Sequence, residues 1–241
     1  MIAFDNVRFS RGERTVLKGL SFSVEEYERA AILGGSGEGK TTILRLIMGL
    51  LRPDSGRILI DGEDITFMSE SRLRKVRTKF SIVFQEGALF DSLDVYENVA
   101  FPLRENSPLS EEEIDGKVRA LLRTVGMEDA IDMMPEELSG GMHRRVAMAR
   151  ALAACDPRMF LYDEPTSALD PANTEIILKL IGKHSEQGRG FILVSHDVQN
   201  AARVANRFLF LRNGLLVFDG AKEDFLRSEL SDVRAFATHT M

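Results

Sequence analysis

The sequence has very little cysteine, with Cys155 alone among 241 residues. A lone cysteine cannot build an intramolecular disulfide framework or a multi-cysteine metal cluster, and this indicates a reducing compartment. Long apolar runs are missing too, since the longest uncharged ones, 30–33 and 208–211, fall far short of the roughly 18 to 20 residues that span a bilayer. The amino end lacks the continuous apolar segment of a secretion signal. We therefore expect a cytoplasmic protein whose own chain crosses no membrane.

An excess of positive charge is also absent. Lys and Arg total 31 against 37 Asp and Glu, which gives a formal net charge of −6 at pH 7. Sequence-independent nucleic-acid binding needs many cationic contacts to phosphate, so we expect no nucleic-acid partner. No low-complexity tract, long linker or internal repeat interrupts the chain. The length favours a single domain over 1–241 that folds without a disulfide or metal.

Short apolar segments alternate with helical patterns, which predicts an α/β fold with a mostly parallel sheet. The predicted strands cover 30–33, 80–84, 159–163 and 191–195. Asn213 and Gly214 join two apolar runs, which is a strong hairpin signal. Alternation within 2–33 and in GRILIDGEDI predicts further short strands.

The segment from about 86 to 138 has helical periodicity and predicts an insertion into the sheet. Ser110 and Glu113 match a capping box, and Leu109 and Ile114 are placed as a hydrophobic staple. An apolar stripe follows and ends at Gly126. Its members, which we expect in a core, are Ile114, Val118, Leu121, Leu122 and Val125.

Residues 34–42 read GGSGEGKTT and match the pattern G-x-x-x-x-G-K-[ST] between a predicted strand and a predicted helix. Glycines let several backbone N–H groups converge on phosphate oxygens, and the helix start adds its positive end. Lys40 supplies a mobile cation, and the Thr41 hydroxyl can ligate Mg²⁺. Because a carboxylate would repel phosphate, we expect Glu38 to point outward. The predicted phosphate site consists of Gly34, Gly35, Ser36, Gly37, Glu38, Gly39, Lys40, Thr41 and Thr42.

Two adjacent acids, Asp163 and Glu164, directly follow the largely apolar residues MFLY. A buried strand would deliver both carboxylates to its carboxyl end, where open α/β sheets bind ligands. We expect Asp163 to hold Mg²⁺, directly or through water. Glu164 would orient or deprotonate an attacking water.

A second anion site is predicted at LSGGM, residues 138–142. Ser139 is suited to cap the helix that follows, which leaves the N–H groups of Gly140 and Gly141 aimed outward. Basic side chains follow on this helix, and we expect them to form a solvated or partner-facing side. They are Arg144, Arg145 and Arg150.

Taken together, these motifs resemble an ATP-binding-cassette (ABC) ATPase over nearly the whole chain. The shared elements are the phosphate loop, LSGG, Asp163 with Glu164, SALD at 167–170, Gln85 after an apolar strand and VSHD at 194–197. The resemblance implies a P-loop NTPase fold that binds ATP and Mg²⁺, with a nucleotide-binding core and antiparallel β subdomain at about 1–85 and 157–241. A helical subdomain with the signature helix would lie at about 86–156.

The resemblance also implies roles for single residues. His196 would contact the γ-phosphate and join Lys40 and Glu164 in catalysis, and Gln85 would sense Mg²⁺ and link the site to a membrane permease. Asp170 would lie in the loop that joins two monomers. The ATP site of the opposite subunit in a homodimer would be completed by Ser139, Gly140 and Gly141.

Two positions depart from the common pattern of the family. The aromatic residue that stacks on adenine in many cassettes is replaced by Arg11, with Phe9 nearby, and a guanidinium plane can also stack on a base. Met142 replaces the usual glutamine. With Met142 at this position and with residues 85–105, the chain resembles the ATPase subunit of Mce/Mla-type phospholipid transporters. That resemblance implies a permease, an Mce-type lipid-binding subunit and a peripheral position on the cytoplasmic face of the inner membrane.

The segment after Gln85 carries Leu89, Phe90 and Leu93. We expect these residues to be exposed and to receive a short amphipathic helix from the permease. The alternative is that they are buried within the helical lobe.

Other functions stay open at this point. A transporter of another solute would differ only in its partner subunits. A soluble cassette acting on DNA or ribosomes usually has two cassettes or a long coiled coil, and this chain has neither. A catalytically inactive scaffold is disfavoured by Glu164 and the intact phosphate loop.

Overall fold

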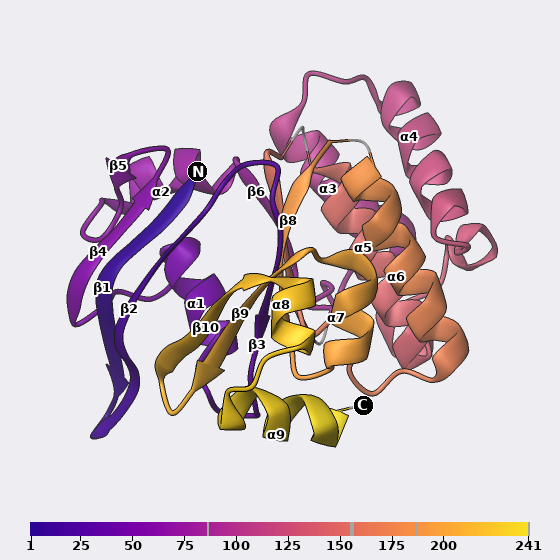
Figure 1. Ribbon diagram of the computed structural model, residues 1–241. Coiled ribbons are helices and arrows are strands. Elements are labelled where there is room, and N and C mark those ends of the chain that lie inside the picture. Colours follow the sequence, from indigo (N-terminus) through magenta and orange to yellow (C-terminus); the bar gives the residue numbers. More distant parts are fainter. Residues whose placement is uncertain (86, 155–156, 187, 241) are drawn as a thin grey trace.

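The structure is a computed structural model that describes residues 1–85, 87–154, 157–186 and 188–240. Cys155, on which the expectation of a reducing compartment rests, lies outside these ranges. Two sheets stand side by side, with a group of helices beyond the larger one (Figure 1). No helix in the described ranges combines the length and apolar character needed to cross a bilayer.

The larger sheet has six strands in the order β10-β9-β3-β8-β7-β6. All neighbours pair in parallel except β9 and β10, which form an antiparallel hairpin at Asn213 and Gly214. Helices cover such a sheet on both faces, so its central strands are apolar throughout. The strands are β3 (Arg29–Leu33), β6 (Phe80–Val83), β7 (Met159–Asp163), β8 (Gly190–Ser195), β9 (Arg207–Arg212) and β10 (Leu215–Ala221). The predicted parallel strands and the hairpin are confirmed.

The smaller sheet is antiparallel, in the order β2-β1-β4-β5, and stands at the left in Figure 1. Its inner face packs on helix α1 (Lys40–Ile47) in one hydrophobic cluster, where the rings of Phe4 and Phe22 stack with centroids 4.7 Å apart. Helix α2 (Glu70–Arg77) adds Leu73 and Val76 to this cluster. The strands are β1 (Ile2–Arg11), β2 (Arg14–Val24), β4 (Ser55–Ile60) and β5 (Glu63–Asp64).

A helical region follows β6 and stands at the right in Figure 1. The Ser110 capping box is confirmed, because Ser110 Oγ accepts from the Glu113 N–H and Glu113 Oε2 accepts from the Ser110 N–H at 2.8 Å. The predicted stripe that follows is buried, apart from the half-buried Leu121. The elements are α3 (Val95–Asn106), α4 (Glu111–Thr124), α5 (Gly140–Ala153) and short 3₁₀ turns at Glu128–Ala130 and Pro135–Glu137.

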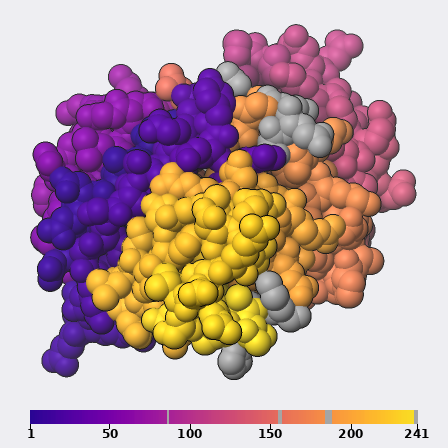
Figure 2. Space-filling model, viewed as in Figure 1, coloured from indigo at the N-terminus to yellow at the C-terminus, as the bar shows by residue number. Residues whose placement is uncertain are grey.

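The remaining helices return the chain to the larger sheet. The last residues spread over the near face of the molecule, in yellow in Figure 2. The rings of Phe236 and Phe210 pack there with centroids 4.8 Å apart. These helices are α6 (Pro171–Glu186), α7 (Val198–Val204), α8 (Lys222–Leu226) and α9 (Ser231–Thr240).

Candidate nucleotide site

The phosphate loop joins the carboxyl end of β3 to the start of α1. Gly39 precedes the helix with φ +99°, and a Cβ there would lie 2.8 Å from Leu17 Cδ2 and 2.9 Å from Val16 Cγ1, so this position requires glycine. Among the residues that the structure describes, no side chain caps α1. The first N–H groups of the helix are therefore left for an anion.

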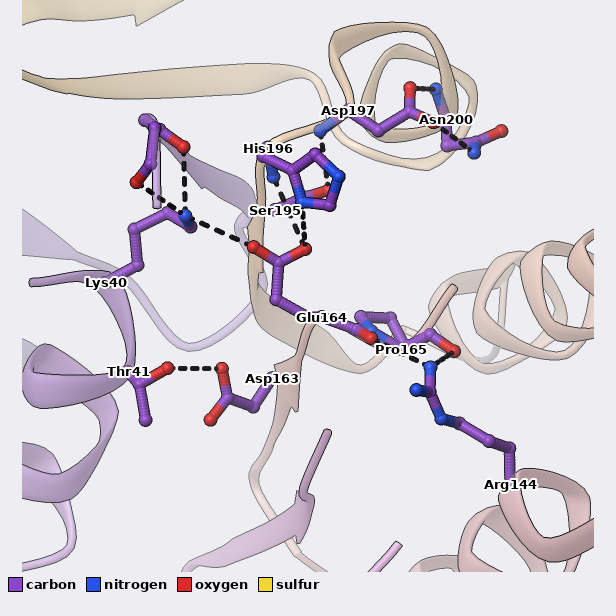
Figure 3. A network of polar contacts seen from close by, with 12 residues as sticks. Lys40, Thr41, Arg144, Asp163, Glu164, Pro165, Ser195, His196, Asp197 and Asn200 are labelled. Atoms are coloured by element: carbon purple, nitrogen blue, oxygen red, sulfur yellow. Dashed lines mark hydrogen bonds and ion pairs between the residues drawn. The ribbon is translucent and has the colours of Figure 1, made fainter. Parts of the chain in front are cut away.

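Lys40, the first residue of α1, points back under the loop (Figure 3). Its Nζ donates to the carbonyls of Gly34 and Gly35 at 2.9 and 3.1 Å and lies 3.1 Å from Glu164 Oε1. An ammonium group has three donors, and these partners occupy all of them. The side chain is only 7% exposed, so a phosphate must take the place of a present partner.

Glu164 stands between Lys40 and His196 (Figure 3). Its Oε2 lies 2.9 Å from His196 Nδ1 and accepts from the His196 N–H at 3.4 Å, so the structure brings the three predicted catalytic residues together. The backbone of Glu164 has φ +47°, a left-handed conformation that costs about 1–3 kcal/mol for a residue with a Cβ. Such conformations persist where the surroundings impose them and cluster at active sites.

Asp163, the last residue of β7, faces Thr41. The Thr41 hydroxyl donates to Asp163 Oδ1 at 2.8 Å. Burial raises the pKa of Asp163 above its ordinary value, the Thr41 hydrogen bond opposes this shift, and the Glu164 charge adds to it.

The donor set formed by Thr41 and Asp163 fits Mg²⁺. One hydroxyl and one carboxylate are hard oxygen ligands, and Mg²⁺ in proteins is commonly held by one or two carboxylates together with water and substrate phosphates. Among the described residues, no group of three or more His, Cys, Asp or Glu side chains could hold a metal by itself. The arrangement therefore suits a magnesium ion that is shared with a nucleotide.

Gln85 lies elsewhere, in a hollow of about 370 Å³ between the segment after β6 and the signature helix α5. The hollow is lined by Gln85, Leu138, Gly140, His143, Arg144, Ser167, Ala168 and Leu169. No contact given for the described residues joins Gln85 to Thr41 or Asp163. The predicted metal role of Gln85 therefore stays a prediction.

The signature residues meet the loop that carries Asp170. Ser139 caps α5, because its Oγ accepts from the Met142 N–H at 3.3 Å. A Cβ on Gly141 would lie 2.6 Å from the Asn173 side chain, and Asn173 donates its N–H to Asp170 Oδ1 at 3.0 Å. Hydrogen bonds from Asn173 lower the pKa of Asp170. Gly140 is exposed, and no contact within the described ranges joins it to the phosphate loop.

Glu38 and Arg11 are two charged residues that were predicted to take part in the site. Glu38 Oε2 accepts from the Gly214 N–H at 3.4 Å, so this carboxylate faces the β9–β10 turn, as expected. Arg11 is exposed and pairs across the β1–β2 turn with Arg14. Arg14, which the sequence analysis did not single out, donates to the Gly37 carbonyl at 3.3 Å. No motif in the sequence marks Arg14 as part of the site.

For the basic residues of α5, the expectation of a solvated side was wrong, and the alternative of a partner-facing side stays a prediction. Arg144, Arg145 and Arg150 do not form a solvated side, because each donates to two backbone carbonyls of a loop or helix end. Such carbonyls have no partner within regular secondary structure, and a guanidinium supplies several donors in a fixed geometry. The acceptors are Glu164 and Pro165, Val125 and Gly126, and Gly87 and Ala88, respectively.

In the segment after Gln85, one predicted residue is buried in the helical region and another is exposed, so each of the two expectations holds for part of it. Leu89 is buried, whereas Phe90 is 42% exposed and packs against the equally exposed Phe101 with ring centroids 4.9 Å apart. Asn98 is fully buried and bonds the Phe90 N–H and C=O, which fixes the turn. Phe101 borders an open hollow of about 610 Å³ between α2 and α3.

Comparisons with known proteins agree with this geometry. The ABC transporter family matches residues 17–167. The intermembrane phospholipid transport system ATP-binding protein MlaF of Haemophilus influenzae is 40% identical over 230 residues, which cover 95% of this chain and 87% of that protein. The methionine import ATP-binding protein MetN of Caulobacter vibrioides is 38% identical and covers 96% of this chain and 70% of that protein.

A solved structure is similar over nearly its whole length. It is the ATP-binding cassette MJ0796, a dimer in a post-hydrolysis state bound to ADP and Pi, with a TM-score of 0.85 and 33% identity over 92% of this chain and 99% of that chain. The predicted P-loop NTPase fold, with its antiparallel β part and its helical part, is confirmed. This chain therefore belongs to the ABC transporter family, as one of its ATPases that bind Mg·ATP.

Proposed function

We propose that this chain is the ATP-hydrolysing subunit of a phospholipid transporter, in which two copies enclose Mg·ATP and drive an integral membrane permease. The observation that carries the catalytic part is the cluster of Lys40, Glu164 and His196 beside the Thr41–Asp163 pair. The lipid part is supported by the similarity to MlaF along nearly the whole chain.

The side chains account for hydrolysis as follows. When the phosphates of ATP enter the loop, Lys40 exchanges Glu164 for phosphate oxygens, and Glu164 is released as a carboxylate held by His196. That carboxylate takes a proton from the attacking water. Mg²⁺ held by Thr41 and Asp163 neutralises phosphate charge when bound. Gln85 remains our candidate for sensing the ion from its hollow beside α5.

The ATP sites are proposed to form between two copies of the chain. Ser139 and Gly140 are exposed at the start of α5, and the N–H groups there suit a phosphate. Within the described part of the chain they make no contact with the phosphate loop, so they are free to face a second copy. The dimeric state of the similar cassette MJ0796 supports this arrangement. Asp170, beside Asn173, would lie at the same interface, and Arg11 stays the candidate for adenine.

The permease is proposed to dock at Phe90 and Phe101. Exposed aromatic pairs beside a hollow mark interaction sites, and a short amphipathic helix is a suitable occupant. Arg74 and Arg77 of α2 and Glu105 of α3 line the hollow and offer charges of both signs. Docking there would hold the chain at the cytoplasmic face of the inner membrane. An Mce-type lipid-binding subunit would complete the complex.

A second candidate substrate is an amino acid, because the methionine import protein MetN is 38% identical. The experiment that separates the two is reconstitution of the complex, purified from its native membrane, into liposomes. We expect ATP-dependent movement of labelled phospholipid that is lost with Glu164→Gln. ATP-dependent uptake of methionine without lipid movement would overturn the lipid assignment and leave the ATPase assignment standing.

The docking proposal has its own test. Phe90→Asp is expected to lose co-purification with the permease, since a carboxylate would stand in the apolar contact. Tyr27→Asp is the matched control, because Tyr27 is an exposed aromatic residue in the β2–β3 turn that belongs to neither the Phe90–Phe101 pair nor the lining of the hollow. Retention of the permease by Phe90→Asp would place the docking surface elsewhere.

A further inference from the structure

Arg144 reaches from α5 to the loop that follows β7 (Figure 3). Its Nη1 donates to the Glu164 carbonyl at 3.0 Å and to the Pro165 carbonyl at 2.9 Å. The side chain is half-buried, and this burial lowers the pKa of the guanidinium while the Glu164 charge opposes the shift. Hydrogen bonds from a cation in such surroundings are stronger than those between neutral groups. Arg144 therefore joins two successive peptide groups to the signature helix.

The two peptide groups belong to the strained part of the catalytic loop. Glu164 has φ +47°, and a residue with a Cβ stays in this region only where its surroundings hold it. The Glu164 N–H donates to the Val194 carbonyl at 3.0 Å, and its carbonyl accepts from the Ser167 N–H at 3.2 Å and from Arg144. Pro165 has no N–H, so the peptide group that joins Glu164 to Pro165 can be held only through the Glu164 carbonyl. Arg144 holds that carbonyl.

The direction of the Glu164 side chain depends on this backbone conformation. Its two carboxylate oxygens reach Lys40 at 3.1 Å and His196 at 2.9 Å on opposite sides. If the backbone relaxed to an ordinary φ, the Cα–Cβ bond would turn away from this position. The carboxylate would then lose its place between the two partners.

We propose that Arg144 is a positioning residue for ATP hydrolysis, which holds the Glu164 and Pro165 carbonyls on α5 and so keeps the Glu164 carboxylate between Lys40 and His196. The proposal rests on the proposed role of Glu164 as the base. It goes beyond that role, because it makes the position of the base depend on the position of the signature helix.

The adjacent residue, Arg145, provides a matched control. Its Nη1 also donates to two carbonyls, those of Val125 at 3.4 Å and Gly126 at 3.1 Å, which lie at the end of α4. Arg145→Met therefore removes the same kind of contact from the same helix without touching the catalytic loop. Arg144→Met removes the contact to Glu164 and Pro165 and keeps an unbranched apolar stem of similar length to that of arginine.

The first experiment measures steady-state ATP hydrolysis by the full chain. Arg144→Met is expected to lower kcat about tenfold or more and to change KM for ATP by less than about twofold. Arg144→Lys, which keeps the positive charge and places its N–H donors on a single nitrogen, should restore part of kcat and serves as the test if Arg144→Met does not fold. Arg145→Met should keep kcat within about twofold under conditions in which it is folded. An Arg144→Met kcat close to wild type, or an equal loss in Arg145→Met, would overturn the proposal.

The second experiment asks whether Arg144 acts through Glu164. In the Glu164→Gln background, Arg144→Met should cause no further loss of residual turnover, because the group that it positions is already gone. A further loss by the same factor as in the wild-type background would show that Arg144 acts by another route. If Glu164→Gln alone keeps wild-type turnover, the proposed base fails. If it is inactive while Arg144→Met is normal, only the positioning role fails.

Discussion

At the scale of single residues, the ion pair between Lys40 and Glu164 joins the two groups that hydrolysis has to separate. We predict that Glu164→Gln lowers turnover by about 10²-fold or more, because a general base contributes about that much. The substitution also removes a carboxylate that competes with phosphate for Lys40. ATP should therefore bind as tightly as to the wild type or more tightly, as measured by titration with a fluorescent ATP analogue.

Lys40→Ala serves as the comparison for Glu164→Gln. It should lose both ATP binding and turnover, since the cation itself is removed. Turnover within a few-fold of wild type in Glu164→Gln would exclude this carboxylate as the base.

Gly141 illustrates a position where one methyl group matters. A Cβ would lie 2.6 Å from the Asn173 side chain, which is bonded to Asp170. We predict that Gly141→Ala has a lower free energy of unfolding than Gly140→Ala, because its Cβ displaces the Asn173 amide from Asp170. Urea unfolding measures this difference. Gly140→Ala is the control, because its Cβ would meet nothing within 4 Å, and equal stability of the two variants would contradict the prediction.

The sequence was informative about residues whose role depends on local motifs. Lys40, Thr41, Asp163 and Glu164 gather as predicted, because a strand and the turn after it place them at one sheet edge. Arg144 could not be predicted in the same way. Its acceptors lie 20 and 21 residues further along the chain, and no periodic pattern records which carbonyls a long side chain will reach.

At the scale of elements, the start of α4 allows a test of helix capping. Ser110 and Ser69 both precede a helix in an extended conformation, but only Ser110 accepts a capping hydrogen bond from its helix. We predict that Ser110→Ala lowers the free energy of unfolding by about 1 kcal/mol. Ser69→Ala should cost clearly less. Urea unfolding of both variants checks the difference, which vanishes if capping is unimportant here.

His143 on α5 makes the stability of the folded chain depend on pH. Burial lowers the pKa of His143, Asp91 opposes this shift, and Arg150 and Arg144 add to it. The unfolded chain therefore binds a proton more readily than the folded chain, so stability falls as pH drops below the ordinary histidine pKa of about 6.5. We predict that His143→Gln loses less stability than wild type between pH 7.5 and 5.5. Urea midpoints at the two pH values measure this, and parallel losses would contradict it.

Some elements carry little signal in the sequence. The capping box and the Asn213–Gly214 hairpin follow from local chemistry and were predictable. Helix α2 has two buried apolar side chains, Leu73 and Val76, in eight residues that are otherwise mainly charged. Such a helix forms because it packs on the cluster beneath the antiparallel sheet, and a local pattern does not reveal that.

At the scale of the whole molecule, the two hydrophobic clusters divide the chain differently from the predicted subdomains. One cluster joins Val99 and Val146 of the helical region to Phe160 and Phe208 of the larger sheet. The other joins the antiparallel sheet to α1. The predicted boundaries at about 86 and 156 were placed from the order of the motifs, whereas the clusters are sets of side chains that are buried together. Those boundaries stay a prediction.

We propose that ATP is enclosed between two copies of the chain, with Glu164 of one copy and Ser139 of the other at each site. The most direct measurement is the mass of Glu164→Gln in solution with ATP, determined by light scattering. We expect the mass to double with ATP, and not to double when Ser139→Arg is added, because the arginine side chain would occupy the phosphate side of the interface. A monomer that still binds one ATP per chain with wild-type affinity would contradict it.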